Sequence, residues 1–398
     1  MGHIYQNGYV TIAATHARDG TVGLHAEARP SSEARALPSK HLYVRQNWDV
    51  IHRNLSSYPD PGCPLLSRGW TLQERLLSPR VVHFLDRKVV WECQHGMKQA
   101  DRTTFEDHWS KLLPIKHHGW SEVDLIELWH DIVVECSQKD LTFEDDRLPS
   151  IAALAQRILL LRPDDEYLAG LWKSTLLQDL VWHCGPSRMK AAAPEGLTKW
   201  NPPSWSWVAV VAGSSFVGYP LGELIAGTTV ISVTYVQTGP AHLGQITDAK
   251  IVIQAHLLLF DLPTSLRRYP LVDHVFPPGS IEIPPPSNAE KNQGSPTVCL
   301  CVWRFDHPGS YYSGAAGGAD SLEAGDQSTT RLYLLPLLRP YSTSVNCLIL
   351  REVSPGIFRR IGFAEIECRA REIDKAYMKK ELIERALSQW PLTRVELV

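Results

Sequence analysis

The spacing of apolar residues near the start of the chain predicts strands and one short helix. Residues 9–14 are typical of a strand, and a long polar stretch follows at 16–66. Residues 68–78 then carry apolar side chains at helical spacing, with Ser67 as a suitable N-cap and Pro79 as a stop. Two runs rich in β-branched residues, 81–85 and 89–93, predict a hairpin. We therefore expect an α/β segment over residues 1–95.

Residues 96–203 change to a helical period. Apolar residues recur at that spacing over 109–113, 123–133 and 151–159, and Pro149 stands at the start of the last of these runs. A further amphipathic run, 167–182, ends before Gly185-Pro186. The pattern predicts a helical region between the α/β segment and the rest of the chain.

From residue 204 to 398 apolar and polar residues alternate with a period of two, which is typical of strands. Trp205 and Trp207 are therefore expected to share a strand face. Further strands are expected at 227–237, 249–260, 297–304, 331–338, 345–353 and 357–366. Many short strands between Pro- and Gly-rich loops favour an antiparallel sandwich or a barrel-like module. The loops 277–297 and 309–330 are expected to be mobile, and 370–388 to form an amphipathic helix with Ile373, Tyr377 and Leu387 towards the body. The whole chain is thus of a mixed α+β and α/β class.

Composition narrows the function classes. The 398 residues carry a formal net charge of -3 and show no basic tract interleaved with aromatics, so a nucleic-acid partner is not expected. No apolar run reaches the ~20 residues of a membrane span. No apolar signal segment follows Met1, so the eight cysteines are expected to be reduced thiols of a cytoplasmic protein. Cys299 and Cys301, two apart on one strand, suit packing better than zinc, and neither a metal nor a resident cofactor is predicted.

The stretch 67–80, Ser-Arg-Gly-Trp-Thr-Leu-Gln-Glu-Arg-Leu-Leu-Ser-Pro-Arg, holds the most informative side chains. Trp70 and Glu74 are four apart and share a helix face, and Gln73 lies beside them. A carboxylate held against an indole, with an amide nearby, is suited to handling a sugar or a nucleotide. The alternative is core packing by Trp70 with a solvated or salt-bridged Glu74.

This helix with the hairpin after it resembles the third motif of the fungal heterokaryon-incompatibility (HET) domain, an Arg-x-Trp-Thr-x-Gln-Glu helix followed by a hairpin. Residues 68–74 match that motif directly. Weaker matches lie at 1–15, 146–150, 167–172 and 203–207, so the resemblance reaches from residue 1 to about 210. It implies a role in fungal non-self recognition and in the programmed cell death that follows fusion of incompatible fungi.

HET domains in turn resemble TIR domains, some of which cleave the nicotinamide–ribose bond of NAD. In TIR domains the catalytic Glu follows a Trp by four residues, the spacing of Trp70 and Glu74 here, although Arg75 replaces the following Leu. The resemblance implies NAD as a substrate, with Glu74, Trp70 and Gln73 as catalytic residues. Arg68 and Arg80 could receive its phosphates. Pairing of the two arginines with Glu74, Asp86 or a helix end is the alternative.

The sequence also departs from the HET pattern at its start. HET domains open with an aromatic-rich strand ending in Trp-Gly, then an Ile-Asp and a Cys-Ile-x-Gln pattern, none of which stands in this sequence. We therefore expect the chain to correspond to the second half of the domain and, as such, to be inactive as an NAD glycohydrolase. The alternatives are a non-enzymatic recognition or scaffold module and an inactive remnant. A protein partner or self-association is expected, since TIR domains work as assemblies.

Overall fold

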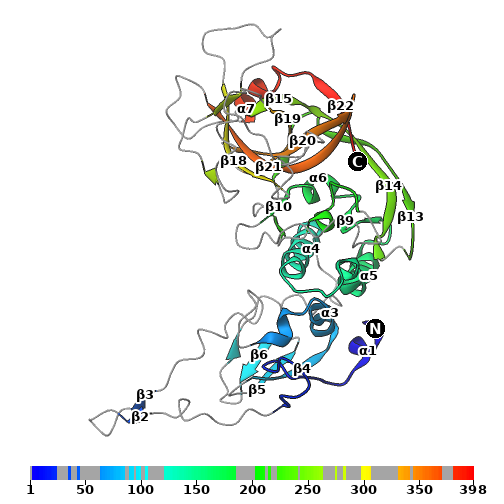
Figure 1. The fold of residues 1–398 in the computed structure, drawn as a ribbon, viewed down its shortest axis with the longest axis vertical. Helices are drawn as coiled ribbons and strands as arrows, with labels where there is room; N and C mark the ends of the chain where they lie inside the picture. The colour runs from blue at the N-terminus through cyan, green and yellow to red at the C-terminus, as the bar shows by residue number, and fades with distance from the viewer. Residues whose placement is uncertain are drawn as a thin grey trace, which may run out of the picture. The chain divides into compact units, whose positions relative to one another are not determined.

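The structure is a computed structural model with two compact units, residues 1–164 and 165–398 (Figure 1). It describes residues 2–24, 63–85, 89–93, 121–184, 202–210, 222–240, 243–262, 330–340, 344–369 and 380–398, with the strand residues 35–36, 43–44, 96–99, 104–105, 214–216, 274–275, 281–283 and 297–305. Both units contain helices and strands, which confirms the mixed fold class. The boundary between the two units falls inside the predicted helical region 96–203, and the division into 1–95, 96–203 and 204–398 stays a prediction.

A small sheet organises the first unit. Its strands run in the order β1-β4-β5-β6-β7, with β1 parallel to β4 and antiparallel pairing elsewhere. The bounds are β1 Thr11–Ala13, β4 Arg80–Phe84, β5 Val89–Cys93, β6 Gly96–Gln99 and β7 Thr104–Phe105. A separate two-stranded ribbon joins β2 Arg35–Ala36 and β3 Tyr43–Val44. The predicted hairpin at 81–85 and 89–93 is therefore confirmed.

Helices complete this unit. They are α1 Gly2–Asn7, the 3₁₀ turn η2 Pro64–Ser67, α3 Trp70–Leu77, α4 Glu122–Ser137, η4 Glu144–Asp146, η5 Pro149–Ile151 and α5 Ala152–Leu161. Ser121 and Asp124 form a capping box that begins α4. Leu72, Leu76 and Leu77 bury the apolar side of α3. The helices predicted within 68–78, 123–133 and 151–159 are thus confirmed, and the expected run at 109–113 lies outside the described residues.

An eleven-stranded sheet dominates the second unit. Its strands are β12 Glu223–Leu224, β13 Thr229–Gln237, β14 Ile246–His256, β15 Leu258–Leu262, β16 His274–Val275, β17 Ile281–Ile283, β18 Thr297–Phe305, β19 Thr330–Arg339, β20 Ser344–Ser354, β21 Ile357–Arg369 and β22 Leu392–Leu397. The pairings β14-β22-β21-β20-β19-β15 form a circuit, because β15 follows β14 after one residue. The sheet therefore curves back on itself, in keeping with the predicted barrel-like module.

The core of this unit lies on one face of the curved sheet. Helix α7, Lys380–Leu387, contributes Ile383, Ala386 and Leu387, which pack with Trp390 against apolar side chains of β15, β19, β20 and β21. Leu387 was expected to face the body and does so. Ile373 and Tyr377 lie outside the described residues, as do the predicted loops apart from strand residues 281–283, 297 and 330.

Residues 165–210 correct two sequence predictions. The run 167–182 is no long helix: β8 Tyr167–Leu168 and β9 Leu171–Trp172 form a hairpin, followed by α6 Leu176–Asp179 and β10 Trp182–Cys184, which pairs with β11 Ser214–Phe216. Ala169 and Gly170 have φ of 48° and 92°, so they make the tight turn that the helical period concealed. Trp205 and Trp207 share no strand, because Ser206 caps the 3₁₀ turn η6 Trp207–Ala209 by accepting from the Val208 N–H.

Candidate functional site

Helix α3 begins where its neighbours leave no room for a side chain. Gly69, not the predicted Ser67, is its N-cap, while Ser67 ends the preceding 3₁₀ turn. The Gly69 N–H donates to the Asp140 carbonyl at 2.8 Å, and a Cβ on Gly69 would lie 2.4 Å from Cδ2 of Leu141. The segment 138–141 lies so close to the chain here that the N-cap is Gly69, two residues after the predicted Ser67.

Trp70 and Gln73 use their polar groups to join α3 to the segment 144–153. The Trp70 Nε1–H donates to Oδ2 of Asp146 at 3.3 Å. The Gln73 Nε2–H donates to the Pro149 carbonyl at 3.4 Å, and its Oε1 accepts from the Ala153 N–H at 3.3 Å. Because Ala153 lies in the first turn of α5, Gln73 satisfies one of the donors that a helix start leaves open. These hydrogen bonds tie α3 to that segment.

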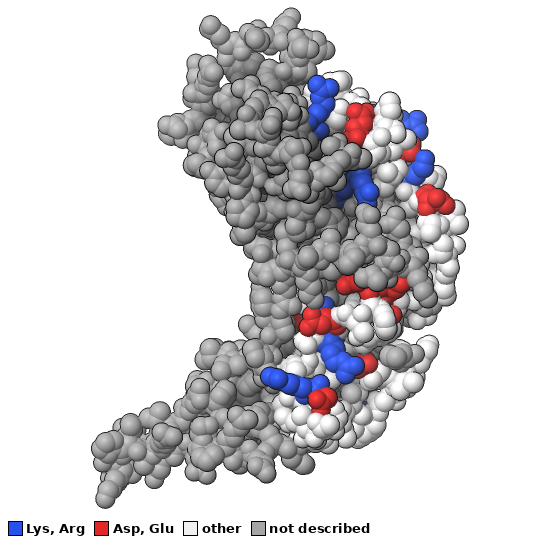
Figure 2. Space-filling model, in the orientation of Figure 1, with Lys and Arg blue, Asp and Glu red and all other residues white. Residues whose placement is uncertain are grey.

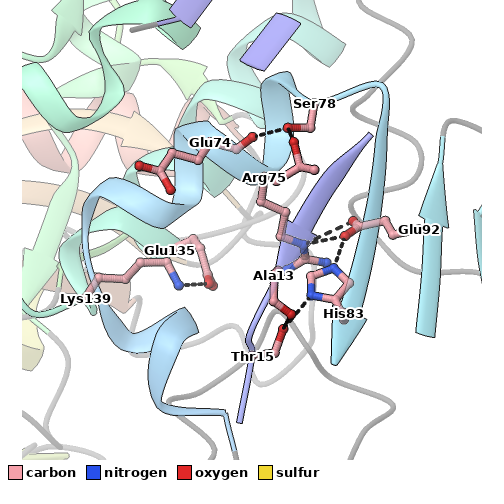
Figure 3. Close-up of polar contacts among 10 residues, drawn as sticks. Ala13, Thr15, Glu74, Arg75, Ser78, His83, Glu92, Glu135 and Lys139 are labelled. Carbon is pink, nitrogen blue, oxygen red and sulfur yellow. Dashed lines mark hydrogen bonds and ion pairs between the residues drawn. The ribbon is translucent and has the colours of Figure 1, made fainter. Parts of the chain in front are cut away.

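Glu74, the third predicted catalytic residue, does not take part in the hydrogen bonds to the segment 144–153. It is half-buried and accepts a hydrogen bond from the Tyr5 hydroxyl of α1. Burial raises the pKa of Glu74, while the Tyr5 hydrogen bond and the charge of Arg68 act in the opposite direction. Figure 3 shows the Glu74 carboxylate pointing away from the polar cluster around Arg75. The charge of Arg68 therefore reaches the Glu74 carboxylate.

The position of Glu74 along the parallel pair bears on ligand binding. Its carbonyl accepts from Ser78 Oγ at 2.7 Å, and Ser78 Oγ lies 2.7 Å from Oγ1 of Thr11. Thr11 is the first residue of β1 and pairs with Val81 near the start of β4. This part of α3 therefore lies at the amino ends of the parallel strands, whereas open α/β sheets bind ligands at the carboxyl ends.

The Arg80 side chain contacts Tyr9. Its Nη1–H donates to the Tyr9 carbonyl at 3.2 Å, and the guanidinium carbon lies 5.0 Å from the centre of the Tyr9 ring. Arg80 and Glu74 are not brought together by any interaction within the described residues. Asp86, the other acidic residue predicted as a partner for the arginines, lies outside those residues.

A buried polar network behind α3 escaped the sequence analysis. Nε of Arg75 donates to Oε1 and Oε2 of Glu92 at 3.1 and 2.8 Å, and Oε2 also lies 2.7 Å from Nε2 of His83. Nδ1 of His83 lies 2.9 Å from Oγ1 of Thr15 (Figure 3). The sequence did hold a sign of this network. Side chains alternate between the two faces of a hairpin, and this alternation places His83 and Glu92 on the same inward face.

The order of hydroxyl, imidazole and carboxylate in this network is that of a nucleophile, a base and an orienting acid. Here Thr15 and His83 are 0% exposed and Glu92 is 1% exposed. A substrate carbonyl has no path to the Thr15 oxygen in this state. The network therefore joins α3, β4, β5 and the residues after β1 as a structural unit.

The network makes stability depend on pH. Burial alone raises the pKa of Glu92, but the Arg75 charge and the His83 hydrogen bond outweigh it and lower the pKa to about 2, from 4.5. A carboxyl whose pKa is lower in the folded state stabilises above pH ~4.5, and that contribution is lost as the pH falls towards 2. We expect a loss of about 3 kcal/mol from this group across that window, at 1.36 kcal/mol per pKa unit.

Hydrogen exchange of the β4 and β5 amides, with rates corrected for pH, measures this loss. The double variant Arg75→Met/Glu92→Leu has no carboxyl at this position and no buried guanidinium beside it, and it serves as the control. Wild type should lose protection between pH 5 and 3 more steeply than the variant. Equal slopes in the two proteins would contradict the assignment.

Among the described residues, no three or more His, Cys, Asp or Glu side chains gather closely enough to hold a metal ion. The helices in the same part of the chain are each too short or too polar to cross a membrane. Comparison of the chain with protein-family models, with curated proteins and with solved structures finds no match in any of the three.

Proposed function

We propose that this protein acts in fungal non-self recognition as a HET-type protein, and that it does so by binding a protein partner rather than by catalysis. The family part of the proposal rests on the match at residues 68–74 and the hairpin after it. The choice of binding over catalysis rests on one observation. Trp70 and Gln73, two of the three residues expected at a reaction centre, are tied into hydrogen bonds that hold α3 to the segment 144–153.

An exposed apolar surface supports a partner on this unit. Ile4 of α1, Tyr9, and Ile12 of β1 are 74%, 81% and 61% exposed. Single exposed apolar residues are common, but three within the nine residues that run from α1 into β1 form a candidate contact. In the part of the chain that the structure describes, β1 pairs with β4 alone, so its other edge can receive a strand.

Expression of the chain in a fungal cell that carries the partner is expected to lower cell survival. Ile12→Asp should abolish that effect, because an exposed strand residue becomes charged at the contact while the fold is kept. Leu160→Asp is the matched control, since Leu160 of α5 is 77% exposed in the same unit. Survival measured by colony counts should fall with wild type and with Leu160→Asp. Equal killing by Ile12→Asp, at equal protein level, would contradict a role for this surface.

NAD cleavage is the second candidate, favoured by the setting of Glu74. A half-buried carboxylate can stabilise the ribosyl cation that forms as nicotinamide leaves and can hold the ribose hydroxyls. Tyr5 and Arg68 would orient it. The position of Glu74 at the amino ends of β1 and β4 weighs against this candidate. NAD loss that requires Glu74 is expected if the protein cleaves NAD, and it is not expected if the protein acts only by binding a partner.

A further inference from the structure

A pocket with a volume of about 440 Å³ lies beside the end of strand β22, within the second unit. Its lining comes from the loop before Trp205, the first residues of β14, the β20–β21 hairpin and Val398, which follows β22. Its volume is in the range of pockets that hold small molecules. Part of the wall is apolar and includes Pro203, Ile246 and Val353, so the pocket is suited to the apolar body of a ligand.

The pocket lies where β22 ends between two longer strands. Leu397, the last residue of β22, pairs with Ile251 of β14 on one side and with Phe358 of β21 on the other. Past these pairs β14 and β21 run on without β22 between them, and residues 246–250 and Arg359 line the pocket. Paired strands are about 4.8 Å apart, so two strands on either side of a missing one are roughly 10 Å apart. This separation leaves room for a small molecule between the side chains of the two strands.

Hydrogen bonds fix one wall of the pocket. Ser204 Oγ accepts from the Arg360 N–H at 3.1 Å and donates to the Val398 carbonyl. The Val398 N–H in turn donates to the Phe358 carbonyl at 3.0 Å. Because Ser204 joins β21 to the end of β22, the loop that carries Pro203 is held beside both strands. This wall is therefore formed before a ligand binds, which lowers the entropic cost of binding.

The acidic residue of the lining, Asp248, lies in a bulge of β14. Tyr235 of β13 is opposite two residues of β14, Asp248 and Ala249, and Asp248 has a φ of 49°. Bulges re-aim side chains and are frequent next to binding and active sites. Among the residues that the structure describes, no hydrogen bond or ion pair involves the Asp248 carboxylate. Asp248 therefore offers the pocket a negative charge that is not bound by a neighbouring cation.

Arg359, on the other strand, offers the opposite charge. It stands directly across from Arg351 of β20, and like charges in that arrangement repel. Burial lowers the pKa of Arg351, and the charge of Arg359 lowers it further. In the described part of the chain no acidic side chain pairs with Arg359. The other basic residue of the lining, Lys250, differs from it, because its Nζ lies 2.8 Å from Oε1 of Glu396 on β22.

The charges of the pocket select the class of ligand. A ligand with a negative charge alone would be repelled by Asp248, and one with a positive charge alone would be repelled by Arg359. A ligand that carries both charges pairs with both residues. Figure 2, drawn in the orientation of Figure 1, shows basic and acidic side chains close together near the C-terminus of the chain. Neither sign of charge dominates there, so selection depends on the individual groups rather than on a broad field.

We propose that this pocket binds a small zwitterion with an apolar body, of the α-amino acid or dipeptide class. Its ammonium group pairs with Asp248 and its carboxylate with Arg359, while its apolar part packs against Pro203 and Val353. This inference does not depend on the proposed function, because it concerns a pocket of the second unit rather than the contact around Ile12.

Four probes with the same aromatic body test the requirement for two charges. L-phenylalanine and L-alanyl-L-phenylalanine are zwitterions that differ in the separation of their charges, phenethylamine is a cation and 3-phenylpropanoate is an anion. Isothermal titration calorimetry on the full chain should show at least one zwitterion binding about tenfold more tightly than either single-charge probe, since each charged contact contributes a factor of this order. The absence of binding by both zwitterions, or equal binding of zwitterions and single-charge probes, would overturn the proposal.

Two variants of the pocket test the roles of the charged residues. Asp248→Asn keeps a residue that tolerates a positive φ, and it should weaken zwitterion binding about tenfold while strengthening that of 3-phenylpropanoate. Arg359→Gln should weaken zwitterion binding to the same extent while strengthening that of phenethylamine. A folding defect cannot produce these opposite gains. Arg385→Gln, at an exposed arginine of α7, is the control and should bind all four probes as wild type does. Pocket variants that keep the wild-type order of affinities would overturn the proposal.

Discussion

Replacing Glu92 by glutamine is expected to lower the free energy of unfolding of the first unit by about 3–5 kcal/mol. The change removes the carboxylate that Arg75 binds in a buried site, and removing one partner of a buried ion pair is strongly destabilising. Arg75 is 6% exposed and Glu92 1%, so water cannot replace the lost partner. Native-state hydrogen exchange of amides in β4 and β5 reports on this unit alone.

Two further variants separate the charge effect from packing. Glu127→Gln, at a half-buried glutamate of α4, should change the free energy by less than ~0.5 kcal/mol, as substitutions away from such networks do. The double variant Arg75→Met/Glu92→Leu should recover part of the loss, because no uncompensated charge remains buried. A Glu92→Gln protein as stable as wild type would show that the pair contributes nothing.

Replacing Arg360 by alanine is expected to destabilise the second unit by about 3 kcal/mol. Arg360 is 2% exposed, and its guanidinium carbon lies 3.4 Å from the centre of the Trp182 ring. Its Nη1–H donates to the Leu180 carbonyl at 2.6 Å, and Nη2–H to the Trp182 carbonyl. Truncation removes a buried cation–π contact and leaves two buried carbonyls without these donors.

The neighbouring residue provides the control for this variant. Arg359 is exposed and lies on the opposite side of β21, so Arg359→Ala should cost less than ~0.5 kcal/mol. Arg360→Lys should fall between the two, because an ammonium group cannot reproduce the planar fork. Urea unfolding followed by tryptophan fluorescence, with Trp182 next to the substituted side chain, measures all three. Equal midpoints for Arg359→Ala and Arg360→Ala would refute this role of Arg360.

Patterns of period and turn residues predicted much of the fold. The helix within 68–78, the hairpin at 81–85 and 89–93 and the strands expected from 227 onwards follow from the spacing of apolar residues, because most of these elements bury one face against a core. The errors fell where a local device overrides the period. Ala169 and Gly170 turn a helical pattern into a hairpin, and Ser206 turns a strand pattern into a 3₁₀ turn.

The candidate site was predicted less well than the fold. Spacing alone placed Trp70, Gln73 and Glu74 together on α3, and the structure agrees. Spacing cannot show that Trp70 and Gln73 face a segment some seventy residues later in the chain, because that contact depends on tertiary packing. The same limit hid the pairing of Arg75 with Glu92, which needs α3 to lie over the hairpin.

Cell survival and cellular NAD, measured together after expression of wild type and Glu74→Gln in a fungal cell that carries the partner, test the central claim most directly. Binding without catalysis predicts that both proteins kill equally and that NAD is unchanged before cells die. Glu127→Gln is the control for loss of a half-buried carboxylate. Early NAD loss with wild type and Glu127→Gln, but not with Glu74→Gln, would contradict this account and establish Glu74 as a catalytic residue.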